Sequence, residues 1–281
     1  MTISMADINE LLTVVVPVKN EALNLQYCLE KLSELSNVIV VDSQSSDDTC
    51  RIAEKHHRKV VQFRWSGKYP KKRNWVLHNV KFTTPWVMFL DADELINENV
   101  LNELHLVLPN TKHSAFYLCF DNWFCGKMLR HGDTMCKMAL IRVGFGEYER
   151  TEEEEWSSLD MEIHEQMIVE GTVGKIKARL EHYDKRSLES HLKKHEEYAK
   201  WEAARYTALK RRNCDCSMLT WRQRVKYSLV KYRWFGIAYF LASYFLKCGF
   251  LDGKAGLRFA KMKMWYFATI QKMIKETISE G

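Results

Sequence analysis

The sequence predicts an α/β fold with a doubly wound, mostly parallel sheet, followed by a C-terminal helical extension. Short apolar, β-branched runs, which are typical of strands covered on both faces, occur at residues 11–16, 38–41, 60–63 and 86–90. A stretch with helical periodicity follows each run, up to residue 108. Because strand–helix–strand connections are right-handed, this alternation predicts parallel strands.

Local signals indicate where the helices lie. The first helix carries a single apolar stripe, made of Leu25, Cys28, Leu29, Leu32 and Leu35. N-cap chemistry at residues 45–47, Pro70 in a first turn and Asn97 as a cap mark the next three helix starts. Residues 111–185 are less periodic and predict a mixed extension of the sheet, and residues 186–281 are helical.

Composition excludes several classes of protein. The chain has 281 residues, of which 46% are hydrophobic and 28% charged, with 12 Gly and 4 Pro, so collagen-like, low-complexity and disordered chains are excluded. The first ten residues lack a basic stretch followed by an apolar one, which predicts neither a secretory signal nor an anchor. We therefore expect a cytosolic chain whose eight Cys are free thiols.

Charge is distributed unevenly along the chain. The net charge is +6, yet residues 221–281 carry twelve Lys or Arg against three Asp or Glu. The preceding 220 residues are modestly acidic. This asymmetry indicates that the C-terminal region meets an anionic surface.

Polar residues cluster where the predicted strands end, which is where ligands bind in such sheets. Asp91 and Asp93, separated by Ala92, follow the run at 86–90, and extended backbone would point both carboxylates to the same side. Two such carboxylates can hold one Mg²⁺ or Mn²⁺ ion. The alternative is an acidic pair on a solvated loop.

The first two strand ends offer further candidates. Pro17, Asn20 and Glu21 end the first strand and can fix a base or ribose, or they can simply cap the following helix. Asp42 follows the second strand, where a carboxylate can accept a hydrogen bond from a base or a ribose hydroxyl. Its alternative role is to begin a turn.

A basic segment opens the third helix. Lys68, Lys71, Lys72 and Arg73 lie there, and cations at a helix N-terminus suit an anionic phosphate. The alternative is a solvated basic face. No phosphate-binding glycine motif of the P-loop or dinucleotide type occurs at a strand–helix junction, so a P-loop ATPase, a dinucleotide dehydrogenase or a nucleotidyltransferase is disfavoured.

These residues together resemble the bacterial family 2 glycosyltransferases of the GT-A fold, and especially the group of lipopolysaccharide-core glucosyltransferases. The resemblance rests on VVVPVKNEALNL, VIVVDSQSSDDT, KKRN, WVMFLDADE, MEIHE and Leu180-Glu181-His182, with the Leu251-Asp252-Gly253 turn and Ala255-Gly256-Leu257 beyond. It implies a UDP-sugar donor and inverting transfer of a hexose to a lipid-linked or lipopolysaccharide-core type glycan.

The resemblance also implies residue roles. Asp42 would contact uracil, Asp91 the ribose or metal-bound water, and Asp93 the Mn²⁺ or Mg²⁺ ion. Lys71 or Arg73 would meet the diphosphate. Residues 1–110 would then bind the donor, residues 111–185 would bind the acceptor and supply the base, and residues 186–281 would associate with the membrane.

An inverting transfer needs a carboxylate that takes the proton of the acceptor hydroxyl. Glu165 is the candidate, with Asp160 and Glu162 as rivals, and His164 would complete the metal site or orient the base. The zinc-protease pattern H-E-x-x-H is absent there. The four consecutive glutamates at 152–155 predict a solvated loop.

Three other features have two readings each. His191 and His195 are spaced to bind a metal on one helix face, but exposed positions are the simpler interpretation. Trp123 and residues 130–132 either line an acceptor site or pack in the ordinary way. We hold these alternatives open.

The C-terminal region is rich in aromatic residues, and its apolar stretch at 234–246 has no charged residue. It is short of the roughly 20 residues that span hydrocarbon, so it predicts an interfacial helix. A helix that packs on the catalytic domain or binds a partner would look similar. We therefore expect a peripheral enzyme on the cytoplasmic face of a bacterial inner membrane. We expect no nucleic-acid partner. The competing class of protein is a catalytically silent, membrane-tethered protein that binds a nucleotide-sugar.

Overall fold

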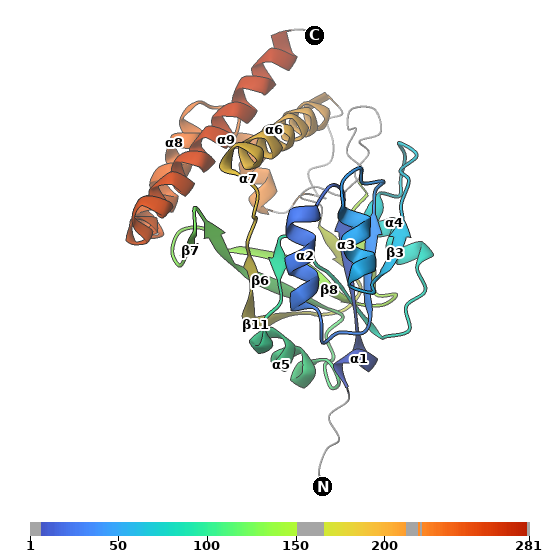
Figure 1. The fold of residues 1–281 in the computed structure, drawn as a ribbon. Helices are drawn as coiled ribbons and strands as arrows, with labels where there is room; N and C mark the ends of the chain where they lie inside the picture. Colours follow the sequence, from blue (N-terminus) through green and yellow to red (C-terminus); the bar gives the residue numbers. More distant parts are fainter. Residues whose placement is uncertain (1–6, 151–165, 212–218, 220, 280–281) are drawn as a thin grey trace. The chain divides into compact units, whose positions relative to one another are not determined.

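The computed structural model of the chain describes residues 7–150, 166–211, 219 and 221–279 (Figure 1). Within this part of the chain there are two compact units. The first comprises residues 7–123, 134–150 and 166–185, and the second comprises residues 124–133, 186–211, 219 and 221–279. The first is the predicted α/β unit and the second is helical.

The α/β unit begins with alternating strands and helices, as predicted. Its first elements are α1 (Ile8–Leu11), β1 (Leu12–Val18), α2 (Ala22–Lys31), β2 (Val38–Asp42), α3 (Thr49–Lys55), β3 (Lys59–Gln62), α4 (Lys72–Asn79), β4 (Trp86–Phe89), β5 (Glu94–Leu95) and α5 (Glu98–Val107). Later strands extend the sheet: β6 (Ala115–Phe124), β8 (Met135–Arg142), β9 (Gly146–Tyr148), β10 (Met167–Val169) and β11 (Val173–His182).

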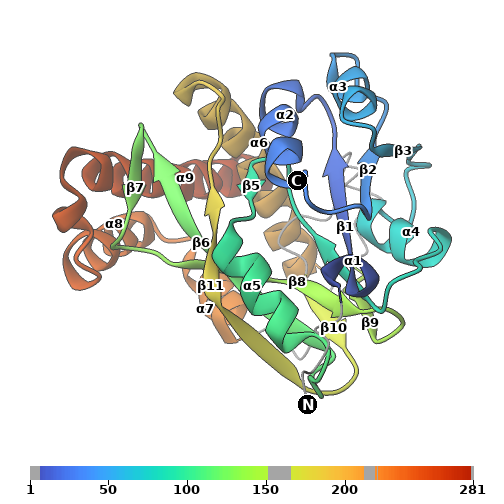
Figure 2. The ribbon, with the colours of Figure 1, turned by 60° about the horizontal axis from the view of Figure 1, so that its bottom comes forward.

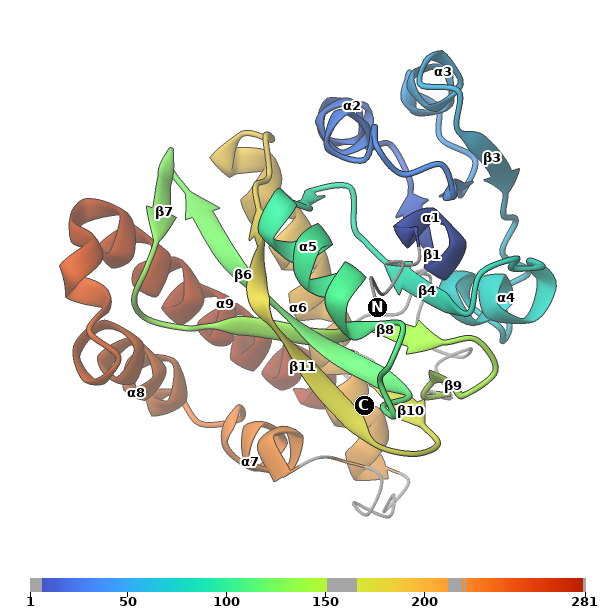
Figure 3. The same cartoon turned by 90° about the horizontal axis from the view of Figure 1, so that it is seen from below.

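The main sheet has the order β3-β2-β1-β4-β8-β6-β11-β5, and β10 pairs separately with β9. Strands β1 to β4 run parallel, with Val18 opposite Asp42 and Leu12 opposite Trp86. Strand β8 is antiparallel to β4 and β6, whereas β11 is parallel to β6 and antiparallel to β5. The mixed α/β sheet and its C-terminal helical extension confirm the predicted fold class (Figures 2 and 3).

Both faces of the central strands β1, β2 and β4 are covered, which is why these strands are almost entirely apolar. On one face, Leu25, Cys28 and Leu29 of α2 and Leu104 of α5 pack against even-numbered residues of β1. On the other, Val76 of α4 joins Tyr148 and Met167 of the β9–β10 pair. The predicted stripe on the first helix is therefore a core face.

Two predicted helix starts differ from the structure. Helix α3 begins at Thr49 with Asp48 at the N-cap position, but the Asp48 side chain makes no cap hydrogen bond, and the carboxylate of Asp47 accepts from the N–H of Thr49 at 3.1 Å instead. The hydroxyl of Ser45 donates to Asp42, so Ser45 takes no part in the cap. Helix α4 begins at Lys72, so Pro70 precedes the helix instead of lying in its first turn. Asn97 caps α5 as predicted, accepting a hydrogen bond from the N–H of Val100 at 3.1 Å.

The expectation that all cysteines are free thiols is wrong for one pair. Cys119 of β6 and Cys136 of β8 are joined by a disulfide. They lie directly opposite in the antiparallel ladder, with Cα atoms 4.0 Å apart, so their side chains meet on one face. Among the described cysteines Cys28, Cys50, Cys125 and Cys248 are free.

The helical unit contains β7 (Lys127–Leu129), α6 (Leu188–Arg211), α7 (Trp221–Leu229), α8 (Trp234–Leu241), the π-helix η2 (Ala242–Leu246), the 3₁₀-helix η3 (Gly249–Asp252) and α9 (Gly253–Ser279). Its core joins Ala203 of α6 and Tyr227 of α7 to Phe267 and Ile270 of α9. A Cβ on Gly256 would lie 2.0 Å from the carbonyl oxygen of Gly249, so η3 and α9 approach each other only because glycine is there.

Candidate active site at the carboxyl ends of the strands

The ends of β1, β2 and β4 bring the predicted polar segments to one edge of the sheet. The N–H of Ser43 donates to the carbonyl of Val18 at 3.0 Å, and the N–H of Leu90 donates to Val15 at 3.0 Å. The acidic turn that follows Leu90 therefore begins beside the segments that follow β1 and β2. Parallel strands impose this convergence, because their carboxyl ends share one edge.

Asp42 is buried at the end of β2, and its carboxylate is already oriented by donors. The N–H of Ser45, the thiol of Cys50 and the amide of Gln62 lie 3.0, 3.2 and 3.0 Å from Oδ2, and the hydroxyl of Ser45 donates to Oδ1. Burial raises the pKa of Asp42, but these hydrogen bonds outweigh it and hold the pKa below its ordinary value. Asp42 is thus an ionised acceptor in a fixed orientation.

The segment after β1 is locked to the loop after β2. Asn20 adopts a left-handed φ of 54°, its side chain accepts from the N–H of Ser46 at 2.8 Å, and its own N–H donates to Ser45 at 2.8 Å. Glu21 is the N-cap of α2, but its side chain makes no cap hydrogen bond and accepts instead from Asn24 at 3.0 Å. Pro17 is buried in β1 opposite Val41.

The basic segment is not a solvated face, so that alternative is wrong for its helical residues. Lys71 and Lys72 are buried, and the ammonium of Lys72 donates to the carbonyl of Val18 at 3.0 Å. Arg73 donates to Oδ1 of Asp91 at 2.8 Å. Lys68, which precedes the helix, is exposed. The positive charge is directed into the sheet edge.

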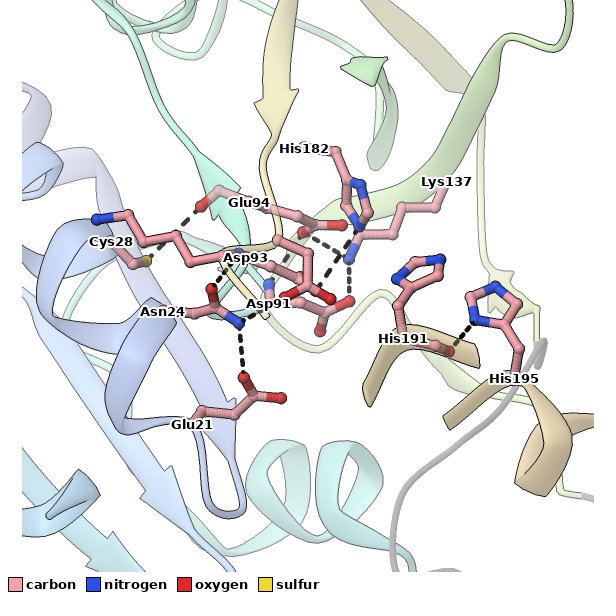
Figure 4. Close-up of polar contacts among 12 residues, drawn as sticks. Glu21, Asn24, Cys28, Asp91, Asp93, Glu94, Lys137, His182, His191 and His195 are labelled. Atoms are coloured by element: carbon pink, nitrogen blue, oxygen red, sulfur yellow. Dashed lines mark hydrogen bonds and ion pairs between the residues drawn. The ribbon is translucent and has the colours of Figure 1, made fainter. Parts of the chain in front are cut away.

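The acidic segment forms a turn instead of the extended backbone that the sequence predicted. The N–H of Glu94 donates to the carbonyl of Asp91 at 2.9 Å, and the carboxylate of Glu94 accepts from the N–H of Asp91 at 2.9 Å. The turn keeps Asp91, Asp93 and Glu94 together, as Figure 4 shows. Their proximity therefore comes from the turn, and not from strand alternation.

Lys137 of β8 lies at the centre of this cluster, although no motif or strand end in the sequence pointed to it. Its ammonium lies 2.8 Å from Oδ2 of Asp91 and 2.7 Å from Oε2 of Glu94 (Figure 4). Burial raises the pKa of Asp91, but Lys137 and Arg73 outweigh it and hold the pKa well below its usual value. Burial also raises the pKa of Glu94, where it outweighs the effect of Lys137.

His182 at the end of β11 is the second residue that the sequence analysis did not assign. Its Nε2 lies 3.7 Å from Oδ2 of Asp93. Strand pairing places it between Glu94 of β5 and Asn122 of β6, and the N–H of Tyr183 donates to the carbonyl of Asp93 at 2.8 Å. The signal that could have found it is its place in the Leu180-Glu181-His182 segment at a strand end.

These side chains suit a divalent cation in part. Among the described residues no group of three or more His, Cys, Asp or Glu side chains converges on one point. Asp93 and His182 nevertheless offer an oxygen and a nitrogen 3.7 Å apart, a spacing that ligands about 2.1 Å from one ion can adopt. Both oxygens of Asp91 are engaged by cations, whereas Asp93 lies beside the imidazole of His182.

The model of the family described as Glycosyl transferase family 2 matches residues 13–164, which is more than half of the chain. The chain belongs to glycosyltransferase family 2. The matched segment runs from the second residue of β1 through β9, and so includes the acidic turn and the carboxyl ends of β1, β2 and β4.

Two curated relatives of this family 2 glycosyltransferase are uncharacterised glycosyltransferases of Rickettsia. The protein from Rickettsia conorii is 30% identical over 99 residues, covering 35% of this chain and 34% of the relative. The protein from Rickettsia felis is 28% identical over the same length and shares. The chain thus spans about one third of the relatives that it matches.

One solved structure that resembles this glycosyltransferase is glucosyl-3-phosphoglycerate synthase from Mycobacterium tuberculosis, crystallised with Mn²⁺, UDP and glucosyl-3-phosphoglycerate. It is 21% identical, and the match covers 42% of this chain and 45% of that chain with a TM-score of 0.30. A second structure of that synthase, with Mg²⁺ and UDP, matches 42% of this chain with a TM-score of 0.31.

Several residues predicted for the glycosyltransferase chemistry lie outside the described residues. These are the candidate bases Glu165, Asp160 and Glu162, together with His164. Their roles remain predictions. The family match ends at residue 164, so it includes Asp160, Glu162 and His164.

Trp123 of β6 lies against Tyr183, with ring centroids 5.6 Å apart and planes at 87°. Its indole nitrogen and the side-chain oxygen of the neighbouring Asn122 are buried, and neither has a hydrogen-bond partner among the described residues. In the helical unit, the N–H groups of Arg130 and His131 donate to the buried carboxylate of Asp252 at 3.1 and 2.9 Å. The backbone at residues 130–131 therefore has an ordinary packing role.

The expectation that His191 and His195 are exposed is wrong. Both are half-buried on α6, their ring centroids are 4.2 Å apart, and Nδ1 of His195 lies 2.9 Å from the carbonyl of His191 (Figure 4). Burial, followed by the positive charges of His191 and Lys263, lowers the pKa of His195 from 6.5 to about 3. His195 is therefore neutral in the folded chain at neutral pH.

This pKa predicts acid lability that His195→Gln should reduce. Because the unfolded chain binds a proton near pH 6.5 and the folded chain only near pH 3, stability is retained above 6.5 and falls as the pH decreases between these values. Urea unfolding midpoints across this range should decline more steeply for the wild type than for His195→Gln. Parallel declines would contradict the assignment.

Proposed function

We propose that this family 2 glycosyltransferase is an inverting hexosyltransferase that uses a UDP-sugar donor and a Mn²⁺ or Mg²⁺ ion. The observation that supports it best is the acidic turn after β4, where Asp93 and His182 can share a cation while Arg73 and Lys137 hold Asp91. A nucleoside diphosphate leaving group needs concentrated positive charge, and this edge of the sheet supplies it.

Each group has a task in this proposal. Asp42, fixed by its donors, accepts the N3–H of uracil, and Asn20 and Glu21 shape the loop beside it. Asp93 and His182 would hold the ion, which would neutralise the departing diphosphate. Arg73, anchored through Asp91, faces the same charge. Lys71, whose ammonium lies 5.6 Å from the centre of the Trp65 ring, is the alternative contact for the diphosphate.

The acceptor is proposed to be a lipid-linked or lipopolysaccharide-core type glycan of a bacterial surface polysaccharide. A sugar hydroxyl is a weak nucleophile at neutral pH, so a carboxylate must take its proton as it attacks. Glu165 is the proposed base, and Asp160 and Glu162 are the alternatives.

The base assignment predicts a specific kinetic phenotype. Glu165→Gln should leave UDP-sugar affinity nearly unchanged and slow transfer by about 10²-fold or more, because the amide cannot accept the proton. Single-turnover transfer and donor binding by calorimetry measure the two quantities separately. If Glu165→Gln retains activity and Asp160→Asn loses it, the base is Asp160.

The donor is tested by thermal stabilisation. Each UDP-sugar of a panel is added with Mn²⁺ to the full chain, and a rise in Tm identifies the ligand by mass action. The identified donor is then assayed for hydrolysis and for transfer to glycolipid acceptors. Binding without turnover under every acceptor condition would favour the catalytically silent protein, and no stabilisation by any UDP-sugar would refute the donor class.

Location follows from the acceptor. We place the enzyme in the cytoplasm, peripheral on the inner face of the bacterial inner membrane, where UDP-sugars and lipid-linked acceptors meet. Within the described part of the chain no single helix is long and apolar enough to span a bilayer. Residues 234–246 and 249–277, bent by 74° at their junction, satisfy that length and composition test only as a pair.

A further inference from the structure

The outward side of α8 and η2 is apolar and exposed. Trp234, Ile237, Leu241 and Phe245 are spaced by three or four residues, so they form one row, and Leu246 extends it. Their exposed fractions are 51%, 54%, 48%, 54% and 83%. We call these five residues the α8–η2 face. Single exposed apolar residues are ordinary, but a contiguous row of large ones marks an interaction site.

The opposite side of the same helix belongs to the core. A Cβ on Gly236 would lie 3.0 Å from the carbonyl of Met264 in α9, and the rings of Phe235 and Tyr239 lie 5.0 and 4.7 Å from that of Phe267. The aromatic residues of this region therefore divide into two sets. Phe235 and Tyr239 pack α8 against α9, so these side chains are not available to a partner. The residues of the α8–η2 face point away from α9.

The charge around the face identifies the chemistry of its partner. Residues 221–251 contain six Lys or Arg and no Asp or Glu. Lys231 and Arg233 are exposed just before α8, and Lys247, exposed by 54%, follows η2 and forms an ion pair with Asp133. A second copy of this surface would bring like charges together, whereas an anionic surface complements it.

Aromatic placement favours a lipid headgroup layer over an acidic protein. Tyr232, exposed by 45%, stacks on Trp234 with planes 15° apart, next to the basic pair. Tyr and Trp side chains combine an apolar body with a polar edge, which suits the boundary between water and hydrocarbon. A row of Trp, Ile, Leu and Phe between basic ends is typical of helices that lie in the plane of a bilayer surface.

We propose that the α8–η2 face docks on an anionic bilayer, with α8 lying in the membrane plane, its apolar row below the headgroups and Lys231 and Arg233 at the level of the lipid phosphates. This goes beyond the proposed function by naming the docking surface, and it depends on that function only for the biological role of the membrane. Its test uses neither donor nor acceptor.

Vesicle flotation with the full-length chain tests the proposal. Vesicles of phosphatidylcholine containing about one third phosphatidylglycerol should carry the wild type at low salt and release it at about 0.5 M salt, since exposed charges are then screened. The double variant Ile237→Asp/Leu241→Asp should partition at least about tenfold less, because charge cannot enter the acyl boundary. Leu106→Asp on α5, where the side chain is 66% exposed, is the matched control and should float like the wild type.

Three results would overturn the proposal. Unchanged flotation of the double variant, with its Tm retained, would place the contact elsewhere. Wild type that resists both high salt and alkaline carbonate would indicate that the bent pair of 234–246 and 249–277 crosses the bilayer. Wild type that ignores vesicles but dimerises, with the dimer lost in the double variant, would assign the face to a second copy. These outcomes can be interpreted even if no UDP-sugar binds the protein, because the flotation assay uses neither donor nor acceptor.

Discussion

Asp93→Asn should reduce glycosyl transfer by on the order of 10²- to 10³-fold, the loss expected when several kcal/mol of metal-derived charge stabilisation disappears. The substitution keeps the size of the side chain and removes its negative charge, so the cation would lose its proposed carboxylate ligand. UDP binding in the presence of EDTA should remain unchanged, because the nucleotide contacts assigned to Asp42 do not involve the ion. Mn²⁺ titrations of transfer rate, with and without EDTA, measure this effect.

Two further variants decide which histidine completes the site. His182→Gln should raise the Mn²⁺ concentration that gives half-maximal activity, because Nε2 of His182 lies 3.7 Å from the Asp93 carboxylate. His164→Gln tests the ligand that the sequence suggested. Asp48→Asn, on an exposed ion pair with Arg51, is the matched control and should behave like the wild type. Near-normal transfer by Asp93→Asn would refute the assignment of the metal to this turn.

Lys137→Met should lower the free energy of unfolding by about 1.5–3 kcal/mol, since it removes the ammonium that compensates the half-buried carboxylate of Asp91 and donates to the buried Glu94. Asp91 and Glu94 would then keep their positions without the cation 2.8 and 2.7 Å away. Methionine has a similar length, so packing alone predicts a far smaller change. Chemical denaturation at neutral pH measures the difference.

The pH dependence separates charge from packing in this variant. The folded-state pKa of Asp91 is lowered, so its contribution is present above its ordinary value of 3.8 and is lost as the pH falls below that value. The difference between wild type and Lys137→Met should therefore close in acid. Lys175→Met, at an exposed position of β11, is the control and should cost little. A deficit that is small at neutral pH, or equal at every pH, would contradict the ion-pair account.

The sequence predicted the donor half of the site more fully than the rest. Asp42, Arg73, Asp91 and Asp93 each lie at or just after a strand or helix boundary, and parallel strands necessarily bring such boundaries to one edge. The local chemistry was less predictable. Asp91 can contact either a metal ion or the side chains of Arg73 and Lys137, and the positions of these two side chains decide which. Lys137 lies 46 positions after Asp91 in the sequence, so local patterns do not reveal their contact.

The aromatic C-terminal region shows the same limit. Its composition indicated an interface, but composition cannot distinguish Phe235, which packs on Phe267, from Trp234, which is exposed. Helical periodicity predicts that α8 has two faces, but it does not predict which of them packs against α9. Gly236 resolves this, because its missing side chain permits the close approach of α9 on that side.

Residue patterns over a few positions were enough to specify the strands, most helices and the polar strand ends, because burial and capping act locally. The order β4-β8-β6-β11-β5 could not be read from those patterns, since it depends on how distant segments pair. That order alone places Lys137 beside Asp91, His182 beside Glu94 and Cys119 opposite Cys136. Local sequence therefore determined which polar residues lie at the strand ends, whereas long-range strand pairing determined the charge balance of the site.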